Sequence, residues 1–272
     1  VNSTAPAAGR KGAIYATCFA NYNSPAIGEA ARAVLAHNGV ESEVVYPRCC
    51  GMPQLEQGDI ARVVENAQQT AADLAGWIDK DYDIVALVPS CALMLKLEWP
   101  LLAPGDAAIE RLAAHSFDIT EYIVAIAREE GLADGLKALP GGVTLHMACH
   151  ARAQNIGHKA AQMLKLVPDT DVNVIERCSG HGGSIGVTRD FHETALKVGK
   201  PVARRALEAG SRFVASECPL AASHIVAGME QLAAAPGKDG AENELGKNLP
   251  EAGRTYHPIE LFAMAYGLGL TA

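Results

Sequence analysis

The chain has 272 residues, of which 49% are hydrophobic and 20% are charged, so an intrinsically disordered or collagen-like chain is excluded and one large domain or two smaller ones are expected. Its net charge of −8 argues against a basic nucleic-acid-binding surface, and favours proteins or small molecules as partners. No hydrophobic run reaches the roughly 18 residues of a transmembrane helix, because even residues 84–95 contain Pro89, Ser90 and Cys91.

Short strand patterns alternate with longer helical patterns along the chain. In chain order, strands are predicted at residues 12–18, 43–46, 83–88, 143–148, 172–176 and 212–216. Helices are predicted at residues 26–37, 59–78, 156–166, 191–209, from 219 onward and at 257–268, with two short helices between 107 and 130. This alternation is typical of an α/β fold in which crossover helices connect the strands of small parallel sheets.

The order of strands and helices in the first half is repeated in the second. We therefore expect a flexible lead at residues 1–11, a first half at 12–138 and a second half at 139–272, with a polar, glycine-rich surface excursion at 233–254. The lead has no signal-peptide character. The start at Val1 rather than Met indicates that residues precede it in the full gene product.

Seven cysteines lie at or near the ends of the predicted strands. An odd number without a secretory signal favours metal or redox chemistry in a reducing compartment over a disulfide framework. Three cysteines of the first half have partners at nearly constant offsets of 131, 129 and 127 residues, which are Cys18 with Cys149, Cys49 with Cys178, and Cys91 with Cys218. The constant offset indicates an internal duplication.

The duplication predicts where the cysteines meet. Parallel strands bring their carboxyl ends to one edge of a sheet, so the cysteines of each half are expected to converge there. Several thiolates from separate strands suit an iron–sulfur cluster or a soft metal. A lone buried cysteine is more often a small core residue, but all seven lie on the repeat. Gly51 and Gly180, which follow Cys50 and Ser179, predict tight turns beside the metal site.

These motifs resemble the duplicated cysteine-rich CCG-domain family, which includes the CCG-domain subunits of heterodisulfide reductase, of anaerobic glycerol-3-phosphate dehydrogenase, and of lactate and glycolate oxidation systems. The resemblance rests on Cys18-Phe-Ala-Asn-Tyr-Asn, Cys49-Cys50-Gly51-Met52-Pro53 and the stretch from Ser90 to Lys96. It covers residues 12 to about 268. It implies two pseudo-symmetric α/β halves with one or two [4Fe–4S] clusters, of cubane or non-cubane type, that pass electrons between a flavoprotein and a quinone or disulfide.

The sequence departs from the family pattern at three positions. The family commonly ends each half with Cys-x-x-Cys, whereas this chain has only Cys91 in the first half and only Cys218 in the second. Ser179 stands where the second cysteine of a pair is expected. Neither half can therefore supply five thiolates.

The candidate ligands differ between the halves. The first half keeps four cysteines, enough for a four-thiolate cluster, at Cys18, Cys49, Cys50 and Cys91. The second half keeps three, at Cys149, Cys178 and Cys218. His181, three residues after Cys178, is the candidate fourth ligand there, unless it is a surface-turn histidine. Three thiolates with one imidazole suit zinc as well as a cluster with one histidine ligand.

The remaining candidates have less specific signals. His150, beside Cys149, is an alternative ligand or a group that hydrogen-bonds to one. His146, inside an apolar strand, is expected to be a satisfied core histidine, and His224 a packing or solvent residue. Core packing is the simpler role for Trp99 near a cysteine turn. No Gly-x-Gly-x-x-Gly or Walker motif occurs, so a nucleotide-binding function lacks its motif.

The sequence favours an iron–sulfur protein that relays electrons in a flavin-linked dehydrogenase or a heterodisulfide-reductase-like system, with substrate chemistry on a partner subunit. The alternatives are a thiol or disulfide reductase with an open iron position, and a zinc-binding structural module. The expected partners are a flavoprotein or another redox subunit and, through the complex, a quinone or disulfide acceptor. The expected location is the cytoplasm, either free or at the inner membrane through a partner.

Overall fold

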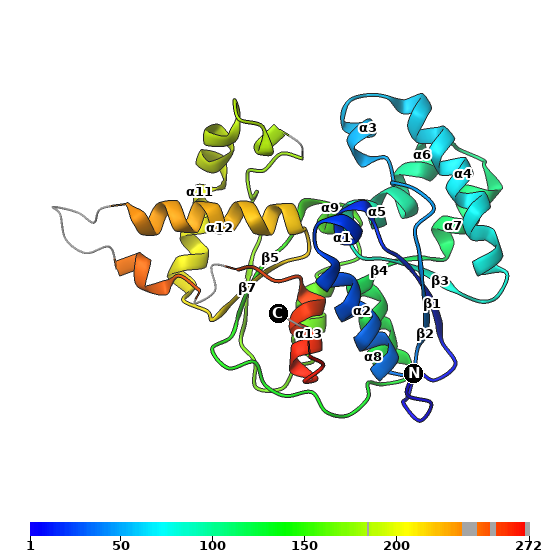
Figure 1. Cartoon of the computed structure of the whole chain (residues 1–272), viewed down its shortest axis with the longest axis horizontal. Helices are drawn as coiled ribbons and strands as arrows, with labels where there is room; N and C mark the ends of the chain where they lie inside the picture. The colour runs from blue at the N-terminus through cyan, green and yellow to red at the C-terminus, as the bar shows by residue number, and fades with distance from the viewer. Residues whose placement is uncertain (184, 236–243, 251–253, 270–272) are drawn as a thin grey trace.

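The computed structural model describes residues 1–183, 185–235, 244–250 and 254–269. It confirms the predicted α/β class with two parallel sheets, one in each half (Figure 1). The first sheet has the strand order β2-β1-β3-β4 and the second has the order β6-β5-β7. The first strand of each half therefore lies between the next two in sequence, as the duplication predicts.

The first half contains four strands and a larger number of helices. The strands are β1 (Lys11–Tyr15), β2 (Glu41–Val45), β3 (Asp83–Ala86) and β4 (Ser116–Asp118). The helices are α1 (Cys18–Tyr22), α2 (Pro25–His37), α3 (Met52–Glu56), α4 (Ile60–Ile78), α5 (Pro89–Leu93), α6 (Trp99–Leu102), α7 (Ala107–Ala114) and α8 (Ile119–Glu129). A π-helical turn, η1 (Met94–Glu98), connects α5 to α6.

The second half has a smaller sheet. Its strands are β5 (Val143–His146), β6 (Val172–Ile175) and β7 (Phe213–Ser216). Its helices are α9 (Cys149–Ala153), α10 (Lys159–Leu164), α11 (His192–Ala209), α12 (Pro219–Ala234) and α13 (Pro258–Ala265). Two 3₁₀ turns, η2 (Ile185–Val187) and η4 (Glu244–Asn248), are also described.

The structure corrects the sequence prediction at several element boundaries. Residues 116–118, which were expected to lie between two helices, form strand β4, whose last residue, Asp118, also caps helix α8. The first predicted strand ends at Tyr15 rather than at residue 18, because Thr17 has a φ of 61° and caps helix α1. Helix α10 begins at Lys159, three residues later than predicted, after Gly157 at a φ of 78°.

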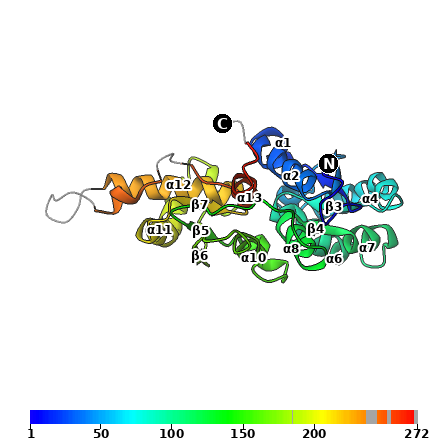
Figure 2. The same cartoon turned by 90° about the horizontal axis from the view of Figure 1, so that it is seen from below.

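The two halves share one large hydrophobic core. Helix α13, at the end of the chain, packs against α2, α8 and α10 rather than only against the second sheet (Figures 1 and 2). Its buried residues, such as Phe262, belong to the same cluster as Leu35 of α2 and Leu145 of β5. A second, smaller core lies between α11, α12 and the second sheet. The halves are therefore joined by buried side chains, and not only by the connecting segment.

Two peripheral segments also contact the body of the protein. The lead was expected to be flexible, but Ala5 and Ala7 are buried in the structure, and the Asn2 N–H donates to the Ala36 carbonyl at 2.9 Å. Part of the predicted excursion lies outside the described residues. Its described turn η4 contacts α11 and α12, with the Asn248 side chain donating to the Leu207 carbonyl at 2.9 Å.

Within the described ranges, no helix has the length and hydrophobicity needed to span a membrane.

Two candidate metal centres

The first cysteine cluster, Cys18, Cys49, Cys50 and Cys91, lies at the carboxyl edge of the first sheet. Cys18 begins α1 just after β1, Cys49 and Cys50 follow β2, and Cys91 lies in α5 after β3. The Sγ atoms of Cys18 and Cys49 are 3.9 Å apart, and the Cys50 thiol interacts with both Cys49 and Cys91. The structure therefore brings together four sulfurs that are far apart in the sequence.

Hydrogen bonds between these thiols make their protonation unequal. Bonds from the Cys18 and Cys50 thiols lower the pKa of Cys49 to about 2, and the same bonds raise the pKa of Cys18 and Cys50. The thiolate rather than the thiol binds metal. A bound metal group would therefore displace the protons that these thiols share.

The turn that carries Cys49 and Cys50 is held from inside the core. Gly51 has a φ of 85°, which glycine adopts without steric cost. The Trp99 indole N–H, fully buried, donates to the Cys50 carbonyl at 3.1 Å. From the sequence, core packing was the favoured role for Trp99, and this hydrogen bond was not predicted. The only signal for it was a tryptophan close to a cysteine turn.

Replacing Trp99 by phenylalanine is expected to destabilise the protein by about 1–3 kcal/mol, because the Cys50 carbonyl loses its buried partner. The thermal midpoint should fall by roughly 2–4 °C per kcal/mol. Trp77→Phe is the matched control, since Trp77 is only partly buried and contacts Tyr82 and Lys80. Equal shifts in the two variants would show that the Trp99 N–H does not hold the turn.

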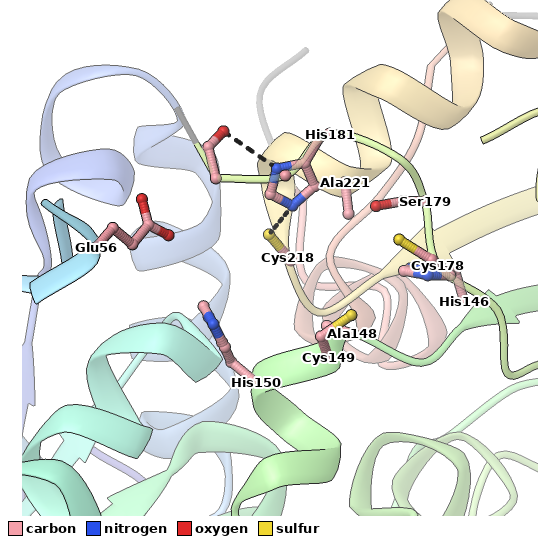
Figure 3. A pocket seen from close by; sticks show the side chains of 12 residues that line it. Glu56, His146, Ala148, Cys149, His150, Cys178, Ser179, His181, Cys218 and Ala221 are labelled. Carbon is pink, nitrogen blue, oxygen red and sulfur yellow. Dashed lines mark hydrogen bonds between the residues drawn. The ribbon is translucent and has the colours of Figure 1, made fainter. Parts of the chain in front are cut away.

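The second cysteine cluster, Cys149, Cys178 and Cys218, borders a cavity of about 170 Å³ (Figure 3). We call it the cysteine cavity. Cys149 begins α9 after β5, Cys178 follows β6, and Cys218 precedes the first turn of α12 after β7. Cys149 and Cys178 match Cys18 and Cys49 in position, whereas Cys218 is the N-cap of α12 and Cys91 is the third residue of α5.

His181 joins this cluster. Its Nε2 lies 3.8 Å from the Cys218 Sγ, and its Nδ1 donates to the Gly183 carbonyl at 3.3 Å (Figure 3). With Nδ1 carrying the proton, Nε2 presents the lone pair that metal ligation requires. Burial lowers the pKa of His181, which keeps the ring neutral. The structure therefore places a neutral imidazole nitrogen beside the second cysteine cluster.

Two further side chains border the cysteine cavity. His150 follows Cys149 along α9, and Glu56 comes from α3 of the first half (Figure 3). A Cβ on Gly183 would lie 2.4 Å from a Glu56 carboxylate oxygen, which shows how closely α3 of the first half approaches this turn. Glu56 was missed as a site residue, because nothing in its local sequence shows that α3 reaches the other half.

Burial and nearby backbone N–H groups have opposite effects on the pKa of the thiols in the second cluster. Burial raises the pKa of Cys149 and Cys218. The backbone N–H groups of Leu220 and Ala221, at the start of α12, act in the opposite direction on Cys218. Such donors stabilise a thiolate at a helix N-terminus.

His146 also borders the cysteine cavity. Both of its ring nitrogens have hydrogen-bond partners, the Ser216 hydroxyl at 2.9 Å and the Arg177 carbonyl at 2.8 Å, which fits its expected role in the core.

The donor sets fit an inorganic cluster by their chemistry. The first supplies four thiols and the second supplies three thiols and an imidazole. The cysteine cavity of about 170 Å³ is several times the ~30 Å³ that a water molecule occupies, which leaves room for a group of several atoms. Among the described residues, no three Cys, His, Asp or Glu side chains form a compact site for a single metal ion.

A serine motif beside this cluster lacks the structure that its chemistry requires. Residues 182–186 have the spacing Gly-x-Ser-x-Gly of a hydrolase nucleophile elbow. That motif needs the serine on a sharp turn directly between a strand and a helix. Here β6 ends at Ile175, the 3₁₀ turn η2 begins only at Ile185, and Ser184 lies outside the described residues. The string gives no support to a hydrolase.

Comparison with known proteins gives a match in each half. A family model described as "CCG: Cysteine-rich domain" matches residues 13–96 and again 143–225, which is more than half of the chain. Each matched segment contains one of the two cysteine clusters.

The chain is also similar to several curated proteins. One subunit of the anaerobic glycerol-3-phosphate dehydrogenase of Escherichia coli (strain K12) is 24% identical over 215 residues, covering 76% of this chain and 52% of the relative. Lactate utilization protein A of Geobacillus thermodenitrificans is 30% identical over 190 residues, covering 65% and 74%. One subunit of the dihydromethanophenazine:CoB--CoM heterodisulfide reductase of Methanosarcina acetivorans is 24% identical over 231 residues, covering 80% and 54%. The chain thus spans about half the length of two of these relatives.

Proposed function

This chain belongs to the CCG cysteine-rich domain family, and from that premise we propose that it is an iron–sulfur subunit that transfers electrons within a dehydrogenase or reductase complex. The observation that carries the proposal is the repeated geometry, in which cysteines from equivalent strand ends meet once in each half. Its similarity to subunits of a glycerol-3-phosphate dehydrogenase and a heterodisulfide reductase supports a role as one component among several.

The proposed ligands follow from the two clusters. Cys18, Cys49, Cys50 and Cys91 would hold a [4Fe–4S] cluster in the first half, and Cys149, Cys178, Cys218 and His181 would hold a second group. A bound iron–sulfur cluster supplies one-electron redox chemistry. The chain's own contribution is to exclude water at the buried Cys50 and Cys91 and to fix the His181 ring through the Gly183 carbonyl.

The finer features are also proposals. The electron donor would be a flavoprotein or another redox subunit, and the final acceptor would be a quinone or a disulfide. The protein would lie in the cytoplasm, free or held at the inner membrane through a partner. The space in the cysteine cavity favours a second candidate, a thiol or disulfide reductase in which substrate sulfur enters beside the second cluster.

Anaerobic purification followed by iron, sulfide and zinc analysis tests this function. Two [4Fe–4S] clusters require about eight irons and eight sulfides per chain, and one cluster requires about four of each. Four of each together with about one zinc would assign zinc to the second half. Zinc without sulfide would contradict the electron-transfer role.

Serine variants assign each cluster to its half. Cys50→Ser is expected to remove about half of the iron and one electron paramagnetic resonance signal, and Cys178→Ser the other half and the other signal. His158→Ala, which changes a partly exposed histidine outside both proposed ligand sets, is the control and should leave both signals. If neither cysteine variant changes the spectrum, the ligand assignment is wrong.

A further inference from the structure

We propose that the Ser179 hydroxyl donates a hydrogen bond to the inorganic group held by the second cysteine cluster and raises the reduction potential of that group. Ser179 follows Cys178 in the turn after β6, and it lines the cysteine cavity. Figure 3 shows its hydroxyl oxygen on the cavity side of this turn. The inference rests on the proposed electron-transfer function, because it assigns a role toward the bound group.

Ser179 combines burial with a polar group that has no partner. The residue is only 3% exposed, and its hydroxyl makes no hydrogen bond to any residue in the described part of the chain. The side chain still borders the cavity, so a bound group can reach it. Buried polar side chains nearly always have a partner, and a hydroxyl can rotate to direct its proton towards one. A group that fills the cavity and displaces its water would be that partner.

The backbone of this turn holds Ser179 in place. Gly180 has a φ of 88°, and α11 crosses the turn so closely that a Cβ on Gly199 would lie 2.2 Å from the Ser179 carbonyl oxygen. The Gly180 N–H donates to the Cys178 Sγ at 3.4 Å. The turn thus already directs one donor at a sulfur of the second cluster, and the Ser179 hydroxyl lies beside it in the chain.

The first half shows why Ser179 need not be a ligand. The 129-residue offset of the duplication aligns Ser179 with Cys50 and His181 with Met52. Cys50 is the fourth thiol of the first cluster, whereas in the second half His181 completes the set of four candidate ligands. A [4Fe–4S] cluster takes four protein ligands. The Ser179 hydroxyl is therefore left as a hydrogen-bond donor.

A hydrogen bond from Ser179 would change the potential of the second centre in a defined direction. Reduction adds negative charge to an iron–sulfur cluster, and hydrogen bonds to its sulfurs are among the features that set its potential. The bond to the more negative, reduced cluster is the stronger one, so the donor stabilises the reduced state more than the oxidised state. The potential of the second centre is therefore raised, and that of the first is not.

An anaerobic redox titration followed by electron paramagnetic resonance tests the role of Ser179. Ser179→Ala should shift the midpoint potential of the second centre downward and leave the first unchanged. At a fixed potential, the ratio of reduced to oxidised second centre should fall roughly twofold to tenfold, as expected for the loss of one hydrogen bond. Ser179→Thr keeps the hydroxyl and should keep the wild-type potential. Ser223→Ala is the control, since Ser223 is exposed on α12 and donates to the Pro219 carbonyl at 3.1 Å.

Electron–nuclear double resonance adds a direct measurement of the proton. The wild type should show an exchangeable proton coupled to the second centre that Ser179→Ala lacks and Ser179→Thr retains. The signal of the Gly180 N–H should be present in all three proteins. Ser179→Gly, which also lacks the hydroxyl, covers misfolding of the alanine variant and should show the same downward shift in potential.

The results separate the role of Ser179 from the proposed function. Equal potentials and equal proton signals in the wild type and both variants without the hydroxyl, at full iron and sulfide content, would overturn the role of Ser179 alone. Loss of iron from Ser179→Ala would make Ser179 a ligand instead of a donor and would overturn the proposal as well. Absence of iron and sulfide from the wild-type chain would overturn the electron-transfer function together with this inference.

Discussion

Replacing Gly199 by alanine is expected to lower the thermal midpoint by roughly 2–12 °C and to reduce the metal content of the second half. Gly199 lies in α11, where the helix backbone crosses the turn after Cys178. A Cβ on Gly199 would lie 2.2 Å from the Ser179 carbonyl oxygen, and a Cβ on Gly180 would lie 2.2 Å from the Ala195 carbonyl oxygen. Both opposing atoms are backbone, so helix and turn must separate. Overpacking of this kind lowers the free energy of unfolding by about 1–3 kcal/mol. Each kcal/mol lowers the thermal midpoint by about 2–4 °C.

Gly76→Ala is the matched control for this effect. Gly76 also lies in a helix, α4, but it is exposed and nothing lies within 4 Å of its added Cβ. Alanine is favoured over glycine by about 1 kcal/mol in a helix, so this variant should be slightly more stable than wild type. Scanning calorimetry with iron analysis measures both variants. A Gly199→Ala protein with an unchanged midpoint and full metal content would show that α11 and the Cys178 turn do not touch as described.

The duplicated α/β architecture could be predicted because its signals are local and occur twice. Periodic apolar residues define α4 and α11 to within a residue or two of their observed ends. Strand β4 was missed because three residues are too few to show alternation. The packing of α13 against the first half was also missed, since its apolar residues indicate burial but do not identify the surface they contact.

The candidate centres show the same difference between features with a local sequence signal and features that depend on contacts between distant segments. Cysteine spacing alone predicted that Cys18 would meet Cys49, which the 3.9 Å separation of their sulfurs now shows. Trp99 and Glu56 carry no spacing signal, and each acquires its position from contacts between segments far apart in the chain. Site residues at positions that occur in both halves can be predicted from the sequence. Residues that act across the boundary between the halves, or between neighbouring helices, are visible only in the structure.

The contribution of Glu217 to the free energy of unfolding is expected to fall as the pH rises from about 5 to 8, and it is measured as the difference in slope between wild type and a variant without this carboxyl, because buried His257, with its pKa lowered to about 3, contributes with the opposite sign. Burial raises the pKa of Glu217 from 4.5 to about 8, and the nearby Asp118 carboxylate adds to the shift. The folded state therefore keeps a proton that the unfolded state has released over this range. Stability is full below the unfolded pKa and declines through the folded pKa, with a slope of about 1.4 kcal/mol per pH unit. Burial also raises the pKa of Asp118, which acts in the same direction.

Glu217→Gln should remove most of this decline, because glutamine resembles the protonated acid and still accepts a bond from the Ala148 N–H, now 3.3 Å from Glu217. At pH 7.5 the variant should be more stable than wild type by roughly 2–4 kcal/mol. Anaerobic urea denaturation at several pH values, at equal metal content, measures the slopes, and Glu208→Gln at an exposed position of α11 is the control. Parallel slopes for wild type and Glu217→Gln would mean that this carboxyl is already ionised in the folded protein at neutral pH. Glu217, next to Cys218 in the sequence, would then carry a negative charge at neutral pH instead of being protonated.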